Sequence, residues 1–343
     1  MNFDLDENQE LFRATVERFC GPGDISARNA ARRLPGAVDR TRWSQLAELG
    51  VIGLAAPEAD GGLGGSLLDC AVVAQALGKG QAVEPWLECG FIPARLLASS
   101  EDIAGVLAGR RLATLACAEP RRRYALDAVT TKVSNGRLNG EKTFVLCGGA
   151  AELFIVSAEQ DGSTQLFAVP HDVAGIEVRP YPVADGTMAA ILTLRDVVVG
   201  VPLKAQLGHV IDDARIMAAA EMTGLAQRLF DDTLAYVKAR EQFGQPLGRF
   251  QVIQHRLVDA YAKLEAMQSA VWRALLVPGS EAAAVKGFVA EEAIWVAQQA
   301  VQLHGGMGMT DELGIGHGLK RILLLSRLFG DPAAGITAAA RAA

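Results

Sequence analysis

The chain reverses direction within residues 240–255, where the sequence reads REQFGQPLGRFQVIQH. Arg240 closes one long amphipathic stretch, and a second begins at Phe250. Between them, Gly244 and Pro246 are residues typical of turns. The segment therefore predicts a helical hairpin with a guanidinium at its corner. Such a group offers paired donors that suit the oxygens of a diphosphate.

Helical patterns extend outward from this turn, and a β-rich segment precedes them. Residues 215–240, 250–272, 281–303 and 318–328 are predicted as helices, and earlier helices are expected within 6–110, including residues 40–49 and 67–77. Residues 112–207 differ, because short apolar runs alternate with turn signals such as Asn139-Gly140. The sequence thus predicts a mainly α chain with a middle antiparallel β domain. The expected domains are residues 1–111, 112–207 and 208–343, the last being a helical bundle.

Bulk properties exclude several classes of protein. The formal net charge of −6 does not favour a nucleic-acid partner. No apolar run approaches the roughly 18 residues of a membrane span, and the acidic N-terminus lacks the features of an export signal. The five cysteines are scattered without ligand spacing, so no metal site is expected. Reduced thiols in a cytoplasmic protein fit this pattern.

Four blocks of sequence resemble the acyl-CoA dehydrogenase family, and together they span nearly the whole chain. The first is a glycine-rich loop between N-terminal helices at residues 49–66, and the second is the start of a long helix at 214–228. The third is the corner at 240–255, and the fourth is a Gln-x-x-Gly-Gly turn at 302–310. The corner is the most specific, because the likeness covers sixteen residues. The family fold has an N-terminal helical domain, an antiparallel β-barrel and a C-terminal four-helix bundle.

The resemblance implies that FAD binds at a subunit interface. It implies that Arg240, with Gln242, Phe243 and Gln251 beside it, reaches the diphosphate of an FAD bound mainly by a neighbouring subunit. Gln302, Gly305 and Gly306 would contact the adenosine-diphosphate half, since paired glycines let a backbone approach a ligand closely. Gly306-Met307-Gly308 is not a dinucleotide fingerprint, because it ends a helix instead of opening one.

The resemblance also implies a substrate and partners. Arg215 corresponds to an arginine near the thioester end of acyl-CoA, although it also reads as a surface arginine at a helix start. An oligomer is implied, either a homodimer or homotetramer or a heteromeric assembly, with an acceptor such as an electron-transfer flavoprotein. His304 reads more simply as a satisfied turn histidine than as an acid or base.

Two family features are altered in the β segment. Glu119-Pro120 resembles the start of the family's Thr-Glu-Pro-x-x-Gly-Ser-Asp loop, but residues 121–125 read RRRYA. Phe144 stands where the family usually has a tryptophan against the flavin, and it can still stack there. Leu146 replaces a serine or threonine and cannot supply a hydroxyl hydrogen bond.

The sequence allows three interpretations of the catalytic base. The family's Tyr-Glu-Gly position corresponds to Phe329-Gly330-Asp331, so Gly330 falls at or beside the expected glutamate. Asp331 is the first candidate. Glu221, an acid on an apolar helix face, is the second, but it reads equally as an anchor for a helix or interface. In the third reading the chain has no base.

Three functions follow from these features. The first is FAD-dependent α,β-dehydrogenation of an acyl-CoA, by this chain alone or as one subunit, as in the smaller partners of two-component steroid side-chain dehydrogenases. The second is a non-catalytic subunit that completes a partner's FAD site. The third is a flavin oxidase on the same scaffold.

Overall fold

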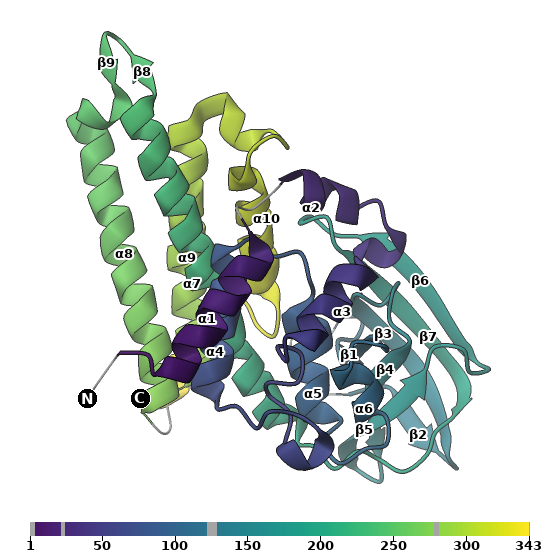
Figure 1. Ribbon diagram of the computed structural model, residues 1–343. Helices are drawn as coiled ribbons and strands as arrows, with labels where there is room; N and C mark the ends of the chain where they lie inside the picture. Colours follow the sequence, from purple (N-terminus) through teal and green to yellow (C-terminus); the bar gives the residue numbers. More distant parts are fainter. Residues whose placement is uncertain (1–3, 22–24, 122–128, 278–280, 343) are drawn as a thin grey trace. The chain divides into compact units, whose positions relative to one another are not determined.

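The computed structural model describes residues 4–21, 25–121, 129–277 and 281–342. The chain forms two compact units, shown in Figure 1. The helical unit comprises Met1–Ala27, Leu67–Ala82 and Arg215–Ala343, and the β unit comprises Arg28–Ser66 and Val83–Ala214. Neither unit is one continuous stretch of sequence, and the expected three-domain division stays a prediction.

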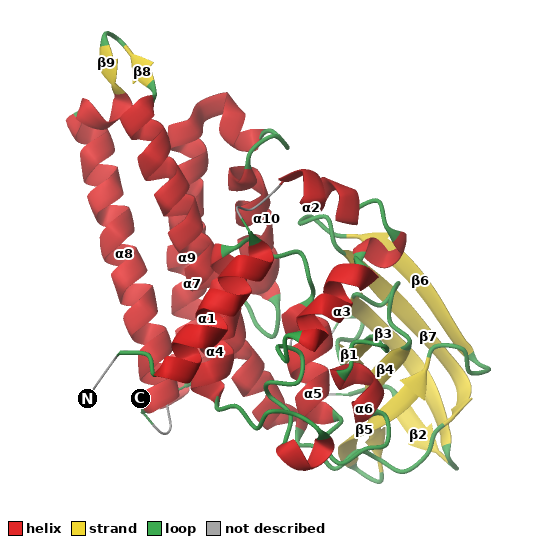
Figure 2. Ribbon diagram, in the orientation of Figure 1, coloured by secondary structure: helices red, strands yellow, loops and turns green. Residues whose placement is uncertain are grey.

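Long helices make up the helical unit, as Figure 2 shows. They are α1 (Glu7–Cys20), α4 (Leu67–Lys79), α7 (Leu207–Ala239, whose first turns belong to the β unit), α8 (Gln251–Leu276), α9 (Ala282–His304), α10 (Gly314–Arg327) and α11 (Pro332–Ala342). Helix α1 packs on α4, and α9 packs against α8, α10 and α11. The helices predicted after residue 215 are therefore confirmed, with somewhat different ends.

Glycines allow α4 and α7 to approach closely. A Cβ atom at Gly224 would lie 2.0 Å from the carbonyl oxygen of Gln75, and one at Gly78 would lie 2.2 Å from that of Glu221. No side chain fits between backbones at that distance. The approach fixes the middle of α7, which carries Glu221.

One mixed sheet forms the centre of the β unit (Figure 1). Its strands are β1 (Ala113–Ala116), β2 (Lys132–Ser134), β3 (Arg137–Leu146), β4 (Leu153–Gln160), β5 (Ser163–Pro170), β6 (Ile176–Pro182) and β7 (Met188–Val198). Their order is β1-β4-β2-β3-β7-β6, with β5 on β4. The expectation of a wholly antiparallel domain is wrong in one respect, because β4 pairs in parallel with β1 and β2. The strand runs were recognisable from composition, whereas pairing direction depends on connections that composition does not encode.

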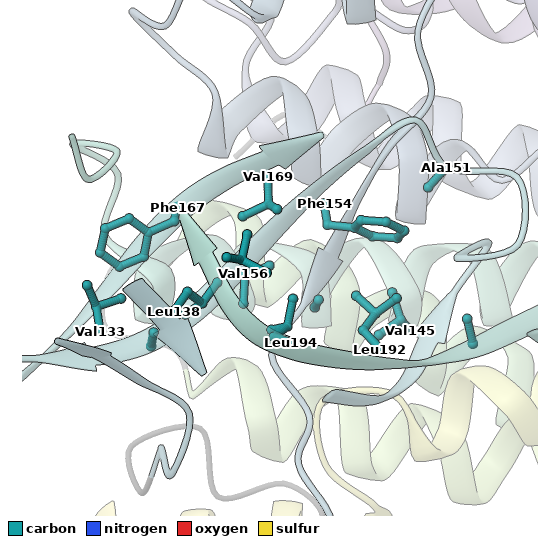
Figure 3. Packing of buried hydrophobic residues seen from close by; sticks show 14 residues of the cluster. Val133, Leu138, Val145, Ala151, Phe154, Val156, Phe167, Val169, Leu192 and Leu194 are labelled. Atoms are coloured by element: carbon teal, nitrogen blue, oxygen red, sulfur yellow. The ribbon is translucent and has the colours of Figure 1, made fainter. Parts of the chain in front are cut away.

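An apolar cluster is formed largely by side chains from the strands of the β unit. Phe154 and Phe167 are fully buried there with branched side chains such as Val156 and Leu194, as Figure 3 shows. The short helices of this unit are α2 (Ile25–Ala31, which begins in the helical unit), α3 (Arg40–Glu48), α5 (Ile92–Leu96) and α6 (Ile103–Leu107), and a π-helical segment, η3, covers Trp86–Phe91.

A buried ion pair lies in the β unit. Lys142 Nζ on β3 donates to Glu119 Oε1 at 2.7 Å and to the Ser157 hydroxyl at 3.1 Å. The second Glu119 oxygen accepts the Thr130 amide at 2.7 Å. Burial opposes ionisation of Glu119, but hydrogen bonds from Lys142, Thr130 and Thr131 outweigh it and lower the pKa of the carboxyl to about 2. Glu119, which resembles part of a family motif in the sequence, is therefore fixed to strand β3 by this ion pair.

Across the described ranges, every helix is too short or too polar to cross a bilayer.

Candidate functional site

The corner at residues 240–250 is a β-hairpin between two helices. Strands β8 (Glu241–Gln242) and β9 (Gln245–Pro246) pair antiparallel, and the hairpin projects beyond the ends of α7 and α8 in Figure 1. Phe243 and Gly244 have φ angles of +54° and +80°. Two successive positive φ values define a tight two-residue hairpin turn, which explains the glycine. The turn predicted from sequence is therefore present, and its two sides pair as short β-strands.

The hairpin presents its functional candidates to solvent. Phe243 is 90% exposed, and its ring lies edge-on to that of Phe250 at a centroid separation of 6.3 Å. Arg240, Gln242 and Gln251 are also exposed. Within the described residues, no hydrogen bond or ion pair engages the Arg240 guanidinium. An uncommitted guanidinium beside an exposed ring suits a flat, anionic ligand from outside the chain.

The glycine pair lies where α9 ends and the 3₁₀ turn η5 (Gly305–Met309) begins. Gly305 has φ +61° and donates its N–H to the carbonyl of Gln302, which is itself exposed. A Cβ atom at Gly305 or Gly306 would meet nothing within 4 Å. The backbone angle explains Gly305, but packing within the chain does not require glycine at 306. A ligand lying against this backbone would require it, so the turn fits the ADP half of a dinucleotide.

A stacked pair of rings joins the hairpin to the glycine turn. The rings of Tyr236 on α7 and His304 on α9 lie 4.3 Å apart at an angle of 24°. His304 Nδ1 contacts the Ala300 carbonyl at 2.8 Å, and the Arg240 amide donates to the Tyr236 carbonyl at 2.8 Å. The two predicted FAD-binding segments therefore share one end of the helical unit, and His304 packs there with its ring satisfied.

A second group of candidates gathers around the segment between α10 and α11. Arg215 on α7 donates from Nε to the carbonyl of Phe329 at 2.9 Å. Phe329 and Gly330 both have positive φ angles, +57° and +121°. A Cβ built on Gly330 would lie 4.0 Å from Arg215 Nη2. The structure thus brings Arg215 next to the position where the family resemblance expects a glutamate.

Asp331 has structural contacts in this segment. Its Oδ1 accepts the Ala334 amide at 2.9 Å at the start of α11, and its Oδ2 lies 3.5 Å from Arg327. The carboxylate is therefore a helix N-cap as well as the first candidate base.

Glu221 is held by an arginine that the sequence analysis missed. Arg321 on α10 donates to both carboxylate oxygens, at 2.7 and 3.2 Å, and both side chains are buried. A carboxylate fixed in a two-pronged ion pair is suited to joining α7 to α10. These contacts favour the anchoring interpretation of Glu221 over the catalytic one.

Phe144 lies on an irregularity of the β unit. Between Lys142 and Val145 strand β3 has two residues opposite one on β7, which is a β-bulge, and Phe144 has φ +53° there. Its side chain is half-buried. The backbone of Leu146, two residues on, accepts the hydroxyl of Thr114 at 2.8 Å. Residues 122–125 of the altered loop lie outside the described residues.

Lys286 is another buried charge that the sequence analysis missed. It lies on α9, is 1% exposed and donates to the carbonyls of Ser326, in the last turn of α10, and of Leu328, just after that helix. The signal was a single lysine within the apolar run AAAVKGFVA at residues 282–290. A lysine on an apolar helix face is rarely buried unless it has a hydrogen-bonding or charged partner.

Several known proteins resemble the chain over nearly its whole length. The family description "Acyl-CoA dehydrogenase, C-terminal domain" matches residues 205–342, and "Acyl-CoA dehydrogenase, N-terminal domain" matches residues 6–90. "Acyl-CoA dehydrogenase IpdE2" of Mycolicibacterium smegmatis is 32% identical over 96% of each chain. "Probable acyl-CoA dehydrogenase YngJ" of Bacillus subtilis is 30% identical over 95% of each. Among solved structures, a chain of "Tcur3481-Tcur3483 steroid ACAD G363A variant" superposes with a TM-score of 0.90, at 28% identity over 98% of both chains.

Proposed function

Because the chain belongs to the acyl-CoA dehydrogenase family, we propose that it acts as one subunit of an assembly whose FAD is held by groups from two chains. As a member of this family it is an FAD-dependent oxidoreductase that acts on the CH–CH bond of an acyl-CoA. The observation that carries the proposal is the exposed hairpin, where Phe243 is 90% exposed and Arg240 is exposed beside it.

The helical unit would hold the dinucleotide half of an FAD at one end. Arg240 would bind the diphosphate, with Gln242, Phe243 and Gln251 beside it. Gln302, Gly305 and Gly306 would lie against the adenosine-diphosphate half, and Phe144 of the β unit would stack on a flavin ring. When bound, the flavin supplies the electron chemistry by accepting hydride.

The segment next to Arg215 would handle the acyl thioester. Donors near the thioester carbonyl lower the barrier to removing the α-proton. Arg215 would contribute to that end of the substrate, and its bond to the Phe329 carbonyl beside Asp331 supports this role. Asp331 would take the α-proton, with Glu221 as the second choice. The electrons would pass to an acceptor such as an electron-transfer flavoprotein.

A second candidate function is that of a non-catalytic subunit. It is supported by the structural contacts that the candidate bases already make. By the family resemblance Gly330 falls at or beside the expected glutamate, while Asp331 caps α11 and Glu221 is paired with Arg321. A chain in this state could complete the FAD site of another subunit and leave proton removal to it.

The FAD proposal predicts the result of removing one guanidinium. Arg240→Ala should lower the FAD retained after gel filtration by about tenfold or more, because a charge-assisted, two-pronged contact is lost. The measurement is the ratio of absorbance at 450 nm to that at 280 nm. Arg249→Ala is the matched control, since Arg249 is an exposed arginine on the same corner and should leave the ratio unchanged. Equal retention in the two variants would contradict the proposal.

The visible spectrum distinguishes an enzyme that works with copies of itself from a subunit of a heteromeric assembly. The chain would be purified alone and co-expressed with the product of a neighbouring gene, and each sample would be tested for dye reduction by acyl-CoA. A yellow, active protein in the first sample supports an independent dehydrogenase. A protein that is colourless alone and yellow with its neighbour supports a heteromeric assembly.

A further inference from the structure

Lys286 makes an unusual set of contacts within the helical unit. Its Nζ donates to the main-chain carbonyls of Ser326, at 2.8 Å, and Leu328, at 2.6 Å. It also donates to the carbonyl of Gly330. The side chain is 1% exposed. The Ser326 carbonyl belongs to the last turn of α10, and the other two carbonyls belong to the segment that follows this helix.

Three acceptors around one nitrogen require the charged form of the lysine. An ammonium has three N–H donors, whereas a neutral amine has two and would turn its lone pair toward the third carbonyl. The carbonyls of Ser326 and Leu328 lie at the end of α10, where the helix dipole is negative. A buried positive charge is therefore compensated here by peptide dipoles.

The segment that Lys286 fixes carries the candidate substrate groups. Its residues Phe329 and Gly330 have positive φ angles, which other contacts must maintain. The Phe329 carbonyl accepts from Arg215, and Asp331 follows directly. We propose that Lys286 is a positioning residue of the acyl-thioester site, which holds the segment 326–331 so that Arg215 and Asp331 keep their places. This inference rests on the proposed function of those two residues.

The charges around Lys286 make its hold on the segment sensitive to pH. Burial lowers the pKa of Lys286, and the neighbouring Arg215 on α7 and Arg327 on α10 lower it further. The carboxylate of Asp331 raises it, and the result is a pKa of about 7. The described side chains of α11 add no charged group. Above neutral pH the amine should release one carbonyl, and the segment should loosen.

Hydrogen exchange of the assembled, FAD-loaded protein tests the proposal. Lys286→Met removes all three donors, and Lys286→Gln keeps two. In the Met variant the amides of residues 328–335 should exchange about tenfold faster or more, with the rest of α9 and α10 unchanged, and the Gln variant should lie between. Lys320→Met is the matched control, because Lys320 lies on α10 and is 38% exposed. In the unsubstituted protein, exchange corrected for its intrinsic rate should rise as pH passes upward through neutrality, and the Met variant should lack that step.

Steady-state kinetics give a second readout. If Lys286 positions the segment, Lys286→Met should lower kcat for acyl-CoA by about tenfold or more and change KM less than threefold. Unchanged exchange at residues 328–335 in the Met variant would overturn the proposal. So would faster exchange spread over the whole helical unit, which indicates a general stabilising role. If the unsubstituted protein fails to bind or oxidise any acyl-CoA, the proposed function fails, but the exchange result still decides what Lys286 holds.

Discussion

An Asp331→Asn variant of the FAD-loaded protein is expected to oxidise acyl-CoA about 10²–10⁴-fold more slowly than the unsubstituted protein, the range typical for loss of a general base. Asparagine is as good a helix N-cap as aspartate, so the contact with the Ala334 amide should persist. The substitution therefore removes the basic carboxylate of residue 331 but keeps the hydrogen bond that caps α11. The rate is measured as dye reduction at saturating acyl-CoA.

Asp311→Asn is the control for this experiment, because Asp311 precedes α10 and its side chain is 64% exposed. It should turn over at the normal rate. A near-normal rate in Asp331→Asn as well would remove Asp331 as the base. Glu221→Gln would then be compared with it, with melting temperature measured alongside, since the loss of half of a buried ion pair with Arg321 lowers stability on its own.

The second large effect is expected in the β unit. Lys142→Met should lower the free energy of unfolding by about 3–5 kcal/mol, because it leaves the Glu119 carboxylate buried without its cation. The measurement is a urea titration of the purified protein. Lys132→Met is the control in the neighbouring strand β2, where the ion pair with Glu159 is exposed and should contribute less than about 1 kcal/mol. Equal losses in the two variants would show that burial of the Lys142 pair adds nothing.

The ion pair of Glu119 and Lys142 should also make the free energy of unfolding fall as pH falls. The pKa of Glu119 is about 2 in the folded chain against an ordinary value of 4.5, so the unfolded chain binds the proton more readily. The stabilisation is complete above pH 4.5 and is lost as pH falls toward 2. Unfolding free energies at pH 6 and pH 3 should therefore differ more in the unsubstituted protein than in Glu119→Gln. An identical difference in both proteins would contradict this assignment.

The helical corner was predictable because its information is local. Gly244 and Pro246 define the turn, and the spacing of apolar residues on either side defines the helices. The positive φ at Phe243 follows from the geometry of a two-residue turn. Family likeness added the ligand, which local patterns alone do not provide.

The contacts around the acyl-thioester candidates depend on distant residues and were not visible in the sequence. Arg321 is separated from Glu221 by 100 positions, and Lys286 from Ser326 by 40. No local pattern states which buried charge meets which acceptor. The bulge at Phe144 is hidden for the same reason, because it is defined by the register of β3 against β7.

The backbone at Gly330 also bears on which residues position 330 can accept. Its φ of +121° is one that residues with side chains rarely adopt. A mutation that placed glutamate there would have to bend the peptide away from its present path and disturb the carbonyl that Lys286 holds. A carboxylate introduced at position 330 would therefore carry a conformational penalty along with its proton affinity.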